Sequence, residues 1–456
     1  MSLQIGIGLA GLGTVGAGVY KHLAQNRALL VERLGLELVV RRVVARDLTK
    51  PRAGLAALPP ASILTKDWRA LIDDPAVEIV VELLGGIDTP LALIRAAIAA
   101  GKTVVTGNKA LLAEHGQEIF ALASAQRVPV FFEASTAGGI PIIKSIREAF
   151  IANHIVSIHG IINGTSNYIL SRMTAEPGLD FADALAAAQA AGYAEADPTL
   201  DINGWDAAHK AIILASLAYG FWVPADRVFV EGIEKISATD IHFAGELGYR
   251  IKLLAIIKAA ATETGQAGGP IEVRVHPTLI PKTHVLASVS GVFNAVAVRG
   301  DVVGETLFYG HGAGQDPTSS AVLSDLAEAA FALRPANEQA PDAGADLRRR
   351  CYGFTPHGLY GACLPLEEIV SRYYLRLAVD DRPGVLAQVA GALGAHGIGI
   401  SSVVQPETHD AAGRAQLVLM LDRATHRQVN AALAEIAALA CVHPPGALLR
   451  VETFGS

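Results

Sequence analysis

The chain has 456 residues, which predicts about three domains at roughly 150 residues each. Hydrophobic residues make up 51% and charged residues 18%, a balance that excludes a disordered chain and a charged coiled coil. The formal net charge of −7 argues against a broad basic surface, so we expect small-molecule ligands and no nucleic acid or membrane partner.

Cysteine usage and the first residues of the chain favour a cytoplasmic protein. The three cysteines form no CxxC pair and no zinc-binding spacing, which is typical of a reducing compartment. The N-terminus shows no basic region and no cleavable apolar segment, so we expect no targeting signal. The longest uncharged run, residues 211–225, is shorter than the ~18 residues that span a bilayer and is predicted to be a core helix.

The first 135 residues alternate short apolar runs with longer helical patterns. This alternation is what a parallel sheet covered by helices on both faces requires. The expected strands lie at residues 4–10, 37–45, 79–82, 102–106 and 128–134.

A glycine fingerprint follows the first of these strands. The sequence GLAGLGTVGAGV contains GxGxxG as Gly11, Gly13 and Gly16, and it opens a predicted helix. In that context the glycines allow a tight turn and let a pyrophosphate approach the helix N-terminus. We therefore predict that Gly11, Gly13, Thr14, Val15 and Gly16 bind a dinucleotide, the alternative being a structural turn alone. Residues 1–135 are predicted to form a Rossmann-like NAD(P)-binding domain.

The pattern changes after this domain. Residues 136–335 mix long helices with β-branched stretches, which predicts an α+β second domain. Residues 336–371 begin with a polar stretch that contains Pro and Gly and are predicted to be a linker. Residues 372–456 follow a βαββαβ, ferredoxin-like pattern. The fold class is therefore predicted to be α/β with three domains.

Charged residues after the second predicted strand bear on the choice of cofactor. Asp47 would bind a ribose 2′-hydroxyl, whereas Arg46 with Lys50 and Arg52 would favour a 2′-phosphate. The three basic residues favour NADP over NAD. Use of both cofactors and an ordinary solvated loop are the alternatives.

Lys109 follows the fourth predicted strand, in Thr106-Gly107-Asn108-Lys109. In open α/β sheets, ligands bind outside the carboxyl ends of the strands. Lys109 is therefore a candidate to contact the nicotinamide end of the cofactor or a substrate carboxylate. The alternative is a solvated charge at a helix start.

The densest group of chemistry-bearing residues is GYAEADPTLDINGWDAAHK, residues 192–210. Asp206 and Lys210 are four residues apart, so they share one helix face and the carboxylate can hold the ammonium in place. Reduction of a carbonyl by hydride needs a proton for the nascent alkoxide, and Lys210 can supply it. The acids that precede the pair suit recognition of a substrate ammonium. The alternative is a surface ion pair.

Several motifs together resemble homoserine dehydrogenase. They are GLGTVG, VELLGG, TGNKALLA, FFEASTAGGIPII, GIINGTSNYIL, the 192–210 run and GHGAGQDPTSSAV, and the tail is similar to ACT regulatory modules. The resemblance covers essentially the whole chain and implies that residues 136–335 are the catalytic and dimerisation domain. It is to the monofunctional form rather than to the aspartokinase fusion. The chain departs from the pattern at Gly107, where many relatives carry alanine, and at His311, which interrupts a GPGAG-like loop.

The resemblance implies reversible reduction of L-aspartate 4-semialdehyde to L-homoserine with NAD(P)H, in threonine and methionine biosynthesis. It places the proton donor on Lys210 and substrate binding on Glu195 and Asp206. Lys109 matches a lysine that contacts cofactor and substrate, and Gly312 is a further candidate for a cofactor contact.

The resemblance also implies a structural cation, regulation and assembly. A monovalent cation, usually sodium, would be held by Glu133 and by backbone carbonyls near Thr136, Gly138 and Ile140. DDRPGVL, residues 380–386, resembles the amino-acid-binding turn of ACT modules. Threonine is therefore hypothesised as an effector, against an oligomerising module without a ligand. We expect a homodimer or, through the tails, a homotetramer.

Two other functions stay open at this point. One is a non-catalytic amino-acid sensor in which the dinucleotide fold and the tail act on a partner protein, although a sensor has no use for a proton donor. The other keeps the enzyme class and changes the substrate to another small amino-aldehyde.

Overall fold

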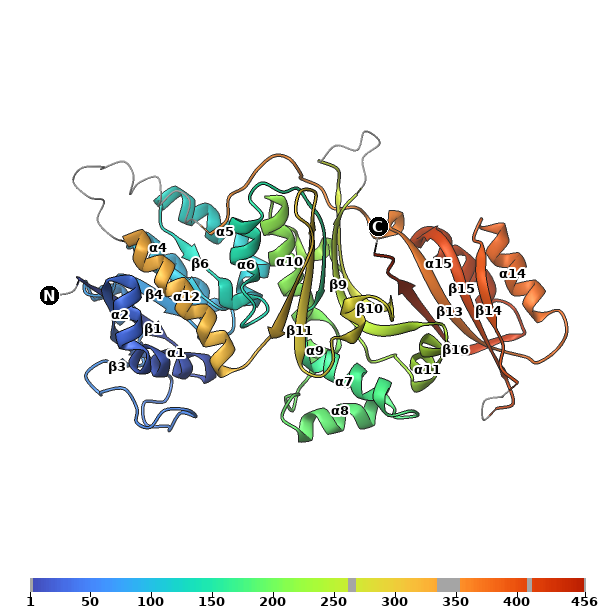
Figure 1. The fold of residues 1–456 in the computed structure, drawn as a ribbon, viewed down its shortest axis with the longest axis horizontal. Coiled ribbons are helices and arrows are strands. Elements are labelled where there is room, and N and C mark those ends of the chain that lie inside the picture. Colours follow the sequence, from blue (N-terminus) through green and yellow to red (C-terminus); the bar gives the residue numbers. More distant parts are fainter. Residues whose placement is uncertain (1–2, 261–267, 334–352, 408–411, 455–456) are drawn as a thin grey trace. The chain divides into compact units, whose positions relative to one another are not determined.

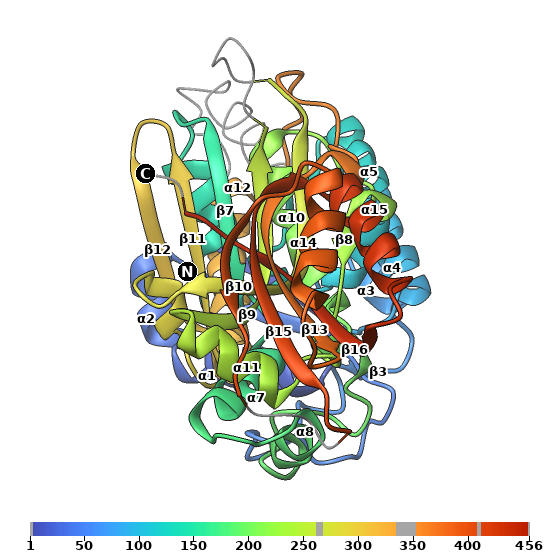
Figure 2. The same cartoon turned by 90° about the vertical axis from the view of Figure 1, so that its right-hand side faces the viewer.

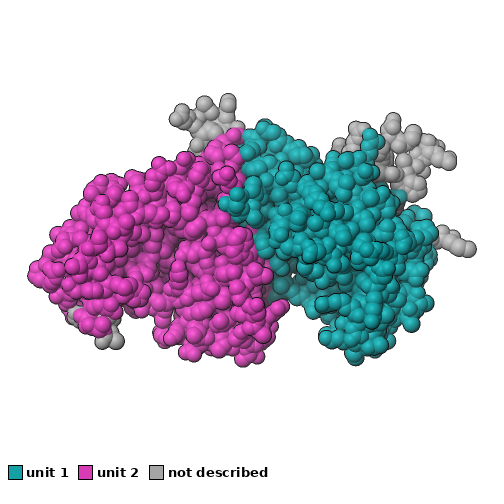
Figure 3. All heavy atoms as spheres, turned by 180° about the vertical axis from the view of Figure 1, so that it is seen from behind, with its two compact units in different colours: residues 1–158, 209–226, 294–361 teal, residues 159–208, 227–293, 362–456 magenta. Residues whose placement is uncertain are grey.

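The computed structural model describes residues 3–260, 268–333, 353–407 and 412–454. The chain forms two compact units, which Figure 3 colours separately. Unit 1 is made of residues 1–158, 209–226 and 294–361, and unit 2 is made of residues 159–208, 227–293 and 362–456. Each unit therefore draws on three separate stretches of the chain.

Unit 1 contains a six-stranded parallel sheet with strand order β3-β2-β1-β4-β5-β6, the order of a doubly wound dinucleotide-binding fold. Figure 1 labels β1, β3, β4 and β6 of this sheet. Its strands are β1 (Leu3–Ala10), β2 (Leu36–Val44), β3 (Leu64–Thr65), β4 (Ile79–Glu82), β5 (Thr103–Thr106) and β6 (Val130–Phe131). The five predicted strands are confirmed. The last is shorter than expected because the chain turns into the 3-10 helix η1 (Glu133–Ser135). The two-residue β3 was not predicted, since so short a strand has no periodic pattern.

Helices and a hairpin complete unit 1. The helices are α1 (Thr14–Gln25), α2 (Arg27–Leu34), α3 (Arg69–Asp73), α4 (Asp88–Ala99), α5 (Lys109–Gln126), α6 (Ile142–Lys144), η2 (Ser145–Ala149), η3 (Ala225–Arg227) and α12 (Gln315–Leu333). The strands β11 (Phe293–Gly300) and β12 (Gly304–His311) are neighbours in a second sheet. The unit boundary falls within α10 (Trp205–Tyr219) and β7 (Ile155–Ile161), and it also separates one end residue each of η3 and β11 from unit 1.

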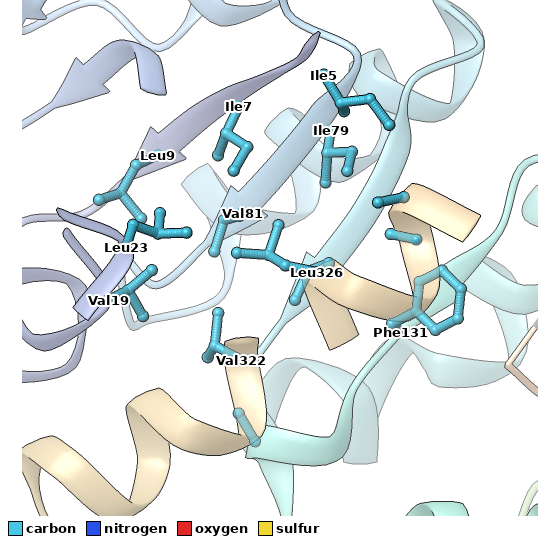
Figure 4. Close-up of a cluster of buried hydrophobic side chains, with 14 of the residues drawn as sticks. Ile5, Ile7, Leu9, Val19, Leu23, Ile79, Val81, Phe131, Val322 and Leu326 are labelled. Atoms are coloured by element: carbon cyan, nitrogen blue, oxygen red, sulfur yellow. The ribbon is translucent and has the colours of Figure 1, made fainter. Parts of the chain in front are cut away.

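Helix α12 completes the core of the dinucleotide-binding sheet, although it comes from a distant part of the chain. Its Val322 and Leu326 are fully buried and pack against apolar side chains of the sheet, among them Val81, and of α1 (Figure 4). At roughly 1.5 to 3 kcal/mol for each buried aliphatic side chain, the two residues contribute several kcal/mol. Unit 1 is therefore not built from the first 135 residues alone.

Unit 2 joins two predicted modules through one continuous run of strands. The order is β9 (Tyr249–Ala259), β10 (Ile271–Pro281), β16 (Val442–Val451), β13 (Val370–Val379), β15 (Ala415–Thr425) and β14 (Ile400–Val404), and β8 (Phe229–Val230) pairs with β10. The connection is a parallel pairing of β10 with β16, in which Thr278 lies opposite Arg450. The last strand of the C-terminal module thus extends the sheet of the module before it.

The C-terminal βαββαβ pattern is confirmed. Helices α14 (Val385–Ala395) and α15 (His426–Ala437) lie on one face of the sheet (Figure 2) and enclose a core with β13 and β15. The other helical elements of unit 2 are α7 (Gly164–Ala175), α8 (Phe181–Ala190), α9 (Thr199–Ile202), α11 (Ala238–Glu246), η4 (Val285–Ser288) and η5 (Leu366–Glu368).

The predicted core helix at residues 211–225 is α10, which begins earlier and ends at Tyr219. Gly220 has a φ of 73° and stops the helix, as a left-handed glycine commonly does. Within the part of the chain that the structure describes, no helix is long and apolar enough to cross a membrane. Residues 336–352 of the predicted linker lie outside the described residues. Further along the linker, Phe354 packs against Phe120 and Trp222.

A buried lysine gives unit 2 a pH-dependent stability. Lys252 on β9 donates to Asn167 Oδ1 at 3.0 Å and to the Val289 carbonyl at 2.6 Å. Burial, followed by the charge of Arg250, lowers the pKa of Lys252 to about 8. Between that pH and about 10.4, the unfolded chain binds more protons than the folded one, so the free energy of unfolding should rise with pH.

We therefore expect pH to change the stability difference between the wild type and Lys252→Met. The free energy of unfolding of the wild type, relative to that of the variant, should increase by roughly 2 kcal/mol between about pH 7 and about pH 9.5. Urea unfolding of both proteins at the two pH values measures this shift. A difference that is the same at both values would mean that Lys252 titrates normally in the folded chain.

Candidate active site

The three fingerprint glycines have different surroundings, and these surroundings explain why each position is a glycine. Gly11 has a φ of 109°, and a Cβ there would lie 2.4 Å from the Leu83 carbonyl oxygen. A Cβ at Gly16 would lie 1.9 Å from the Gly11 carbonyl oxygen, so helix α1 could not approach the turn. Gly13 is exposed, and a Cβ there would meet nothing within 4 Å. Gly13 thus leaves the N-terminus of α1 open to a pyrophosphate.

These surroundings predict that alanine impairs cofactor binding at Gly13 and lowers stability at Gly16. Gly13→Ala should fold normally and raise the KM for the dinucleotide by about tenfold or more, because the methyl group occupies the space of the phosphates. Gly16→Ala should lower the melting temperature, because its methyl group meets backbone. Thermal unfolding and steady-state kinetics of both variants test this. Normal cofactor kinetics in Gly13→Ala would exclude this helix end as the binding site.

Two further loops are fixed to each other at the carboxyl edge of the same sheet. Glu82, at the end of β4, is fully buried and accepts hydrogen bonds from Thr106 Oγ1 at 2.6 Å and from the Leu84 backbone at 2.8 Å. Burial raises the pKa of this carboxyl group. Asn108 Nδ2 donates to the Gly86 carbonyl at 2.7 Å. The loops after β4 and β5 therefore form one rigid surface beside the strand that carries the fingerprint.

Lys109 is the first residue of α5 and is half-buried on this surface. The helix begins here because Asn108 is its N-cap and accepts a hydrogen bond from the Leu111 backbone at 3.2 Å. Because β4 lies between β1 and β5, the structure places Lys109 at the same sheet edge as the fingerprint, as predicted.

The start of α12 lies beside the start of α1. Gln315 Nε2 donates to the carbonyl oxygens of Thr14, at 3.0 Å, and Ala53, at 2.9 Å. Gly312 is buried, and a Cβ there would lie 1.9 Å from Asn294 Nδ2. The sequence motif indicated Gly312, but the contact of Gln315 with the fingerprint helix was not predicted, since it joins residues far apart in the chain.

Glu133 lies in a buried network of carboxyl groups. Its carboxylate accepts hydrogen bonds from the backbone of Ile143 at 3.0 Å and of Lys144 at 2.8 Å, and its own N–H donates to Asp325 at 2.8 Å. Burial raises the pKa of Glu133 to about 7 and that of Asp325 well above its ordinary value. The Glu133 side chain therefore anchors the start of α6, a role that the predicted cation site did not include.

The loop that follows Glu133 is tightly turned. Ala137 and Gly138 have φ values of 57° and 52°, and the Ile140 backbone donates to the Ala137 carbonyl at 3.0 Å. Among the described residues, no group of three or more His, Cys, Asp or Glu side chains could hold a metal ion. The cation site at Glu133 and the backbone carbonyls of this loop stays a prediction.

Helix α10 carries the predicted acid and base on one face. The exposed fraction is 9% for Asp206 and 8% for Lys210, so they are not a solvated surface pair. The adjoining acidic loop differs, because Glu195 is exposed there. A carboxylate and an ammonium that are buried one turn apart can orient each other and can exchange a proton with a bound carbonyl compound.

Asp206 also has a partner that the sequence did not reveal. Asn163 Nδ2 donates to Asp206 Oδ2 at 2.9 Å and to Asp201 Oδ1 at 2.7 Å. Asn163 precedes α7, and Asp201 belongs to α9. The available signal was NGTS, in which an asparagine immediately before a helix is typical of an N-cap.

Comparisons with known proteins show the family to which the chain belongs. The NAD-binding domain of homoserine dehydrogenase matches residues 11–133, homoserine dehydrogenase matches residues 141–327 and the ACT domain matches residues 373–441. A homoserine dehydrogenase from Pseudomonas aeruginosa is 45% identical over 447 residues, 98% of each chain. The chain belongs to the homoserine dehydrogenase family.

Solved homoserine dehydrogenases support this assignment. The enzyme from Thiobacillus denitrificans is 44% identical and matches over 100% of both chains with a TM-score of 0.89. A hyperthermophilic archaeal homoserine dehydrogenase mutant, solved in complex with NADPH, is 26% identical, with a TM-score of 0.60 over 73% of this chain and 99% of that one. As a homoserine dehydrogenase, the protein is an NAD(P)-dependent oxidoreductase that acts on a CH–OH group.

Proposed function

We propose that the enzyme catalyses the reversible reduction of L-aspartate 4-semialdehyde to L-homoserine, on the route to threonine and methionine. The observation that supports this most directly is the buried Asp206 and Lys210 on one face of α10, in a homoserine dehydrogenase. A buried lysine held by a carboxylate is a suitable donor to the oxygen of a reduced carbonyl.

Each candidate residue then has one role in the reaction. The nicotinamide cofactor, when bound, supplies the hydride for the aldehyde carbon. Lys210 donates its Nζ proton to the aldehyde oxygen, and Asp206 orients that ammonium group. Glu195 binds the substrate ammonium, and Lys109 contacts cofactor and substrate. In the oxidative direction, Lys210 accepts the hydroxyl proton.

The absorbance at 340 nm tests this reaction. We expect an increase with NADP⁺ and L-homoserine, and a rate lower by about 10³-fold or more with 4-hydroxybutanoate, which lacks the amino group. No reaction with either substrate would favour the sensor, and equal rates would exclude a site built around an ammonium.

NADP is the proposed preferred cofactor. Arg46 and Lys50 are exposed after β2, so both can reach a 2′-phosphate. The Asp47 carboxylate accepts hydrogen bonds from the backbone of Thr49 at 2.8 Å and of Lys50 at 3.0 Å, which occupies one oxygen that could bind a ribose 2′-hydroxyl. Arg46→Ala should therefore raise the KM for NADP⁺ several-fold and leave the KM for NAD⁺ unchanged. An equal change in both would remove Arg46 from this role.

A structural monovalent cation is proposed at the loop after Glu133. The turned backbone at Ala137 and Gly138 supports it, because a hard cation takes oxygen ligands and a tight turn can direct carbonyls to one point. The ligands would be Glu133 and backbone carbonyls near Thr136, Gly138 and Ile140, and the cation would fix the loop. Melting temperatures in NaCl and in choline chloride of equal ionic strength test this. Equal values would contradict the proposal.

A homodimer is proposed through strand β12, and a homotetramer through the tails. β12 is at the end of its sheet order, and Leu307 and Tyr309 on it are 39% and 55% exposed. Apolar side chains on an edge strand are typical of an interface between subunits. Light scattering should give at least twice the chain mass for the wild type and the monomer mass for Leu307→Lys/Tyr309→Glu. A monomeric wild type would contradict this.

Threonine is proposed as an inhibitor that binds the turn before α14. Asp380 in this turn accepts a hydrogen bond from His443 at 2.7 Å, and Gly384 has a φ of 88° at the helix start. This arrangement leaves backbone N–H groups for a carboxylate. A cavity of about 1270 Å³ in unit 2, lined in part by Arg376 and Arg414, is the alternative place. Asp380→Ala should lose inhibition, and loss in Arg414→Ala alone would favour the cavity.

A further inference from the structure

Asn163 is a buried amide that uses every polar atom of its side chain. It is 4% exposed and forms the N-cap of α7. Its Oδ1 accepts a hydrogen bond from the Ser166 backbone at 2.8 Å, and its Nδ2 donates to Asp201 at 2.7 Å and to Asp206 at 2.9 Å. One side chain thus connects a helix start with two carboxylates from other elements of unit 2.

The cap decides which end of the amide faces the carboxylates. A backbone N–H can only donate, so the atom that meets Ser166 must be the amide oxygen. The NH2 group must then point to the other side, where both of its hydrogens have an acceptor. Rotating the amide would place oxygen against two carboxylates and nitrogen against a donor, which would lose all three hydrogen bonds.

The two carboxylates share this donor. Asp201 and Asp206 both lie within hydrogen-bond distance of one nitrogen, so the two carboxyl groups are close to each other. Like charges at such range oppose ionisation, whereas hydrogen bonds donated to a carboxylate favour it. A second contact, from Ser166 Oγ to the Asp201 carbonyl at 2.8 Å, fixes α9 in place.

We infer that Asn163 is a positioning residue for the reaction: its amide holds the Asp206 carboxylate in the orientation that serves Lys210. This inference rests on the proposed function of Asp206. Asn163 itself touches no reacting atom, and its effect passes through the carboxylate to which it donates.

Asn163→Asp separates the positioning role from the capping role. Aspartate caps helices as well as asparagine does, so α7 should stay formed, but it donates no hydrogen and adds a third negative charge. We expect kcat for homoserine oxidation to fall by about 30-fold or more, with an unchanged KM for NADP⁺. The acidic limb of kcat against pH should move to higher pH. Asn163→Ser, which keeps a cap without the added charge, should show the same changes to a smaller degree.

Asn167 provides a matched control on the same helix. It is 1% exposed, and its Nδ2 donates to the carbonyls of Gly291 at 3.0 Å and Phe293 at 3.1 Å. Asn167→Ala should therefore lower the melting temperature and leave the pH profile of kcat unchanged. If this variant shifts the profile as far as Asn163→Asp does, the effect is structural and the inference is wrong.

The remaining outcomes distinguish the inference from the proposed function. Suppose that Asp206→Asn loses most of its kcat, whereas both Asn163 variants keep a kcat within threefold of wild type and an unchanged pH profile. This result would overturn the inference and leave the proposed function intact. Full activity in Asp206→Asn would overturn the role of Asp206, and the inference with it.

Discussion

Replacing Lys210 with methionine should lower kcat for homoserine oxidation by about 10²- to 10⁴-fold, the usual contribution of general acid–base catalysis. Methionine fills a similar volume, so the buried position in α10 should stay packed. The proton acceptor for the substrate hydroxyl is then gone, whereas the fingerprint and the loops around it are untouched. The KM for NADP⁺ should therefore change little, which steady-state kinetics with varied cofactor would show.

Lys102 offers a control of equal burial. It is 8% exposed, as Lys210 is, and it donates to the Leu71 and Asp74 carbonyls at 3.0 and 2.7 Å. It precedes β5, at the opposite end of that strand from Lys109. Lys102→Met should cost stability but not kcat. A loss of less than about threefold in Lys210→Met, or equal losses in both variants, would remove Lys210 from the chemistry.

Asp240→Ala should destabilise the protein by about 3–5 kcal/mol, the cost of leaving a buried charge without its partner. Asp240 on α11 is fully buried and accepts hydrogen bonds from Arg376 on β13, at 2.7 Å to Nε and 3.1 Å to Nη2. Tyr374 also donates to it, at 3.2 Å. Burial beside this carboxylate raises the pKa of Tyr374. The pair fastens the ACT module to the helix that precedes β9.

Chemical unfolding followed by circular dichroism measures this cost, and two further variants serve as controls. Arg172→Ala removes an exposed ion pair with Glu176 and should cost far less than Asp240→Ala, because solvent screens exposed charges. Asp240→Leu with Arg376→Met removes both charges and should recover most of the loss, because the desolvation cost disappears as well. If Asp240→Ala costs no more than Arg172→Ala, the pair does not hold the module.

Local patterns in the sequence predicted much of this fold. The strands of the dinucleotide-binding sheet and the βαββαβ tail each carry their own periodicity and turn residues, so they are readable without tertiary information. The position of α12 cannot be predicted in this way, because its apolar residues Val322 and Leu326 pack against residues that lie far earlier in the chain. The pairing of β10 with β16 is hidden for the same reason.

In the candidate site, too, local features could be predicted from the sequence and contacts between distant segments could not. Asp206 and Lys210 could be paired from their spacing alone, because four residues make one turn of a helix. Asn163 could be predicted as an N-cap, but its hydrogen bonds to Asp201 and Asp206 depend on how α7, α9 and α10 pack. The carboxylate of Glu133 likewise meets the start of α6, which no local pattern indicates.

A double-mutant cycle in kcat between Asp206→Asn and Lys210→Met tests the coupling of the two residues most directly. Groups that act as one unit are not additive, so the double variant should have a kcat within about threefold of Lys210→Met alone. A double variant whose loss equals the product of the two single losses would show that the carboxylate and the ammonium act independently, and would contradict the account.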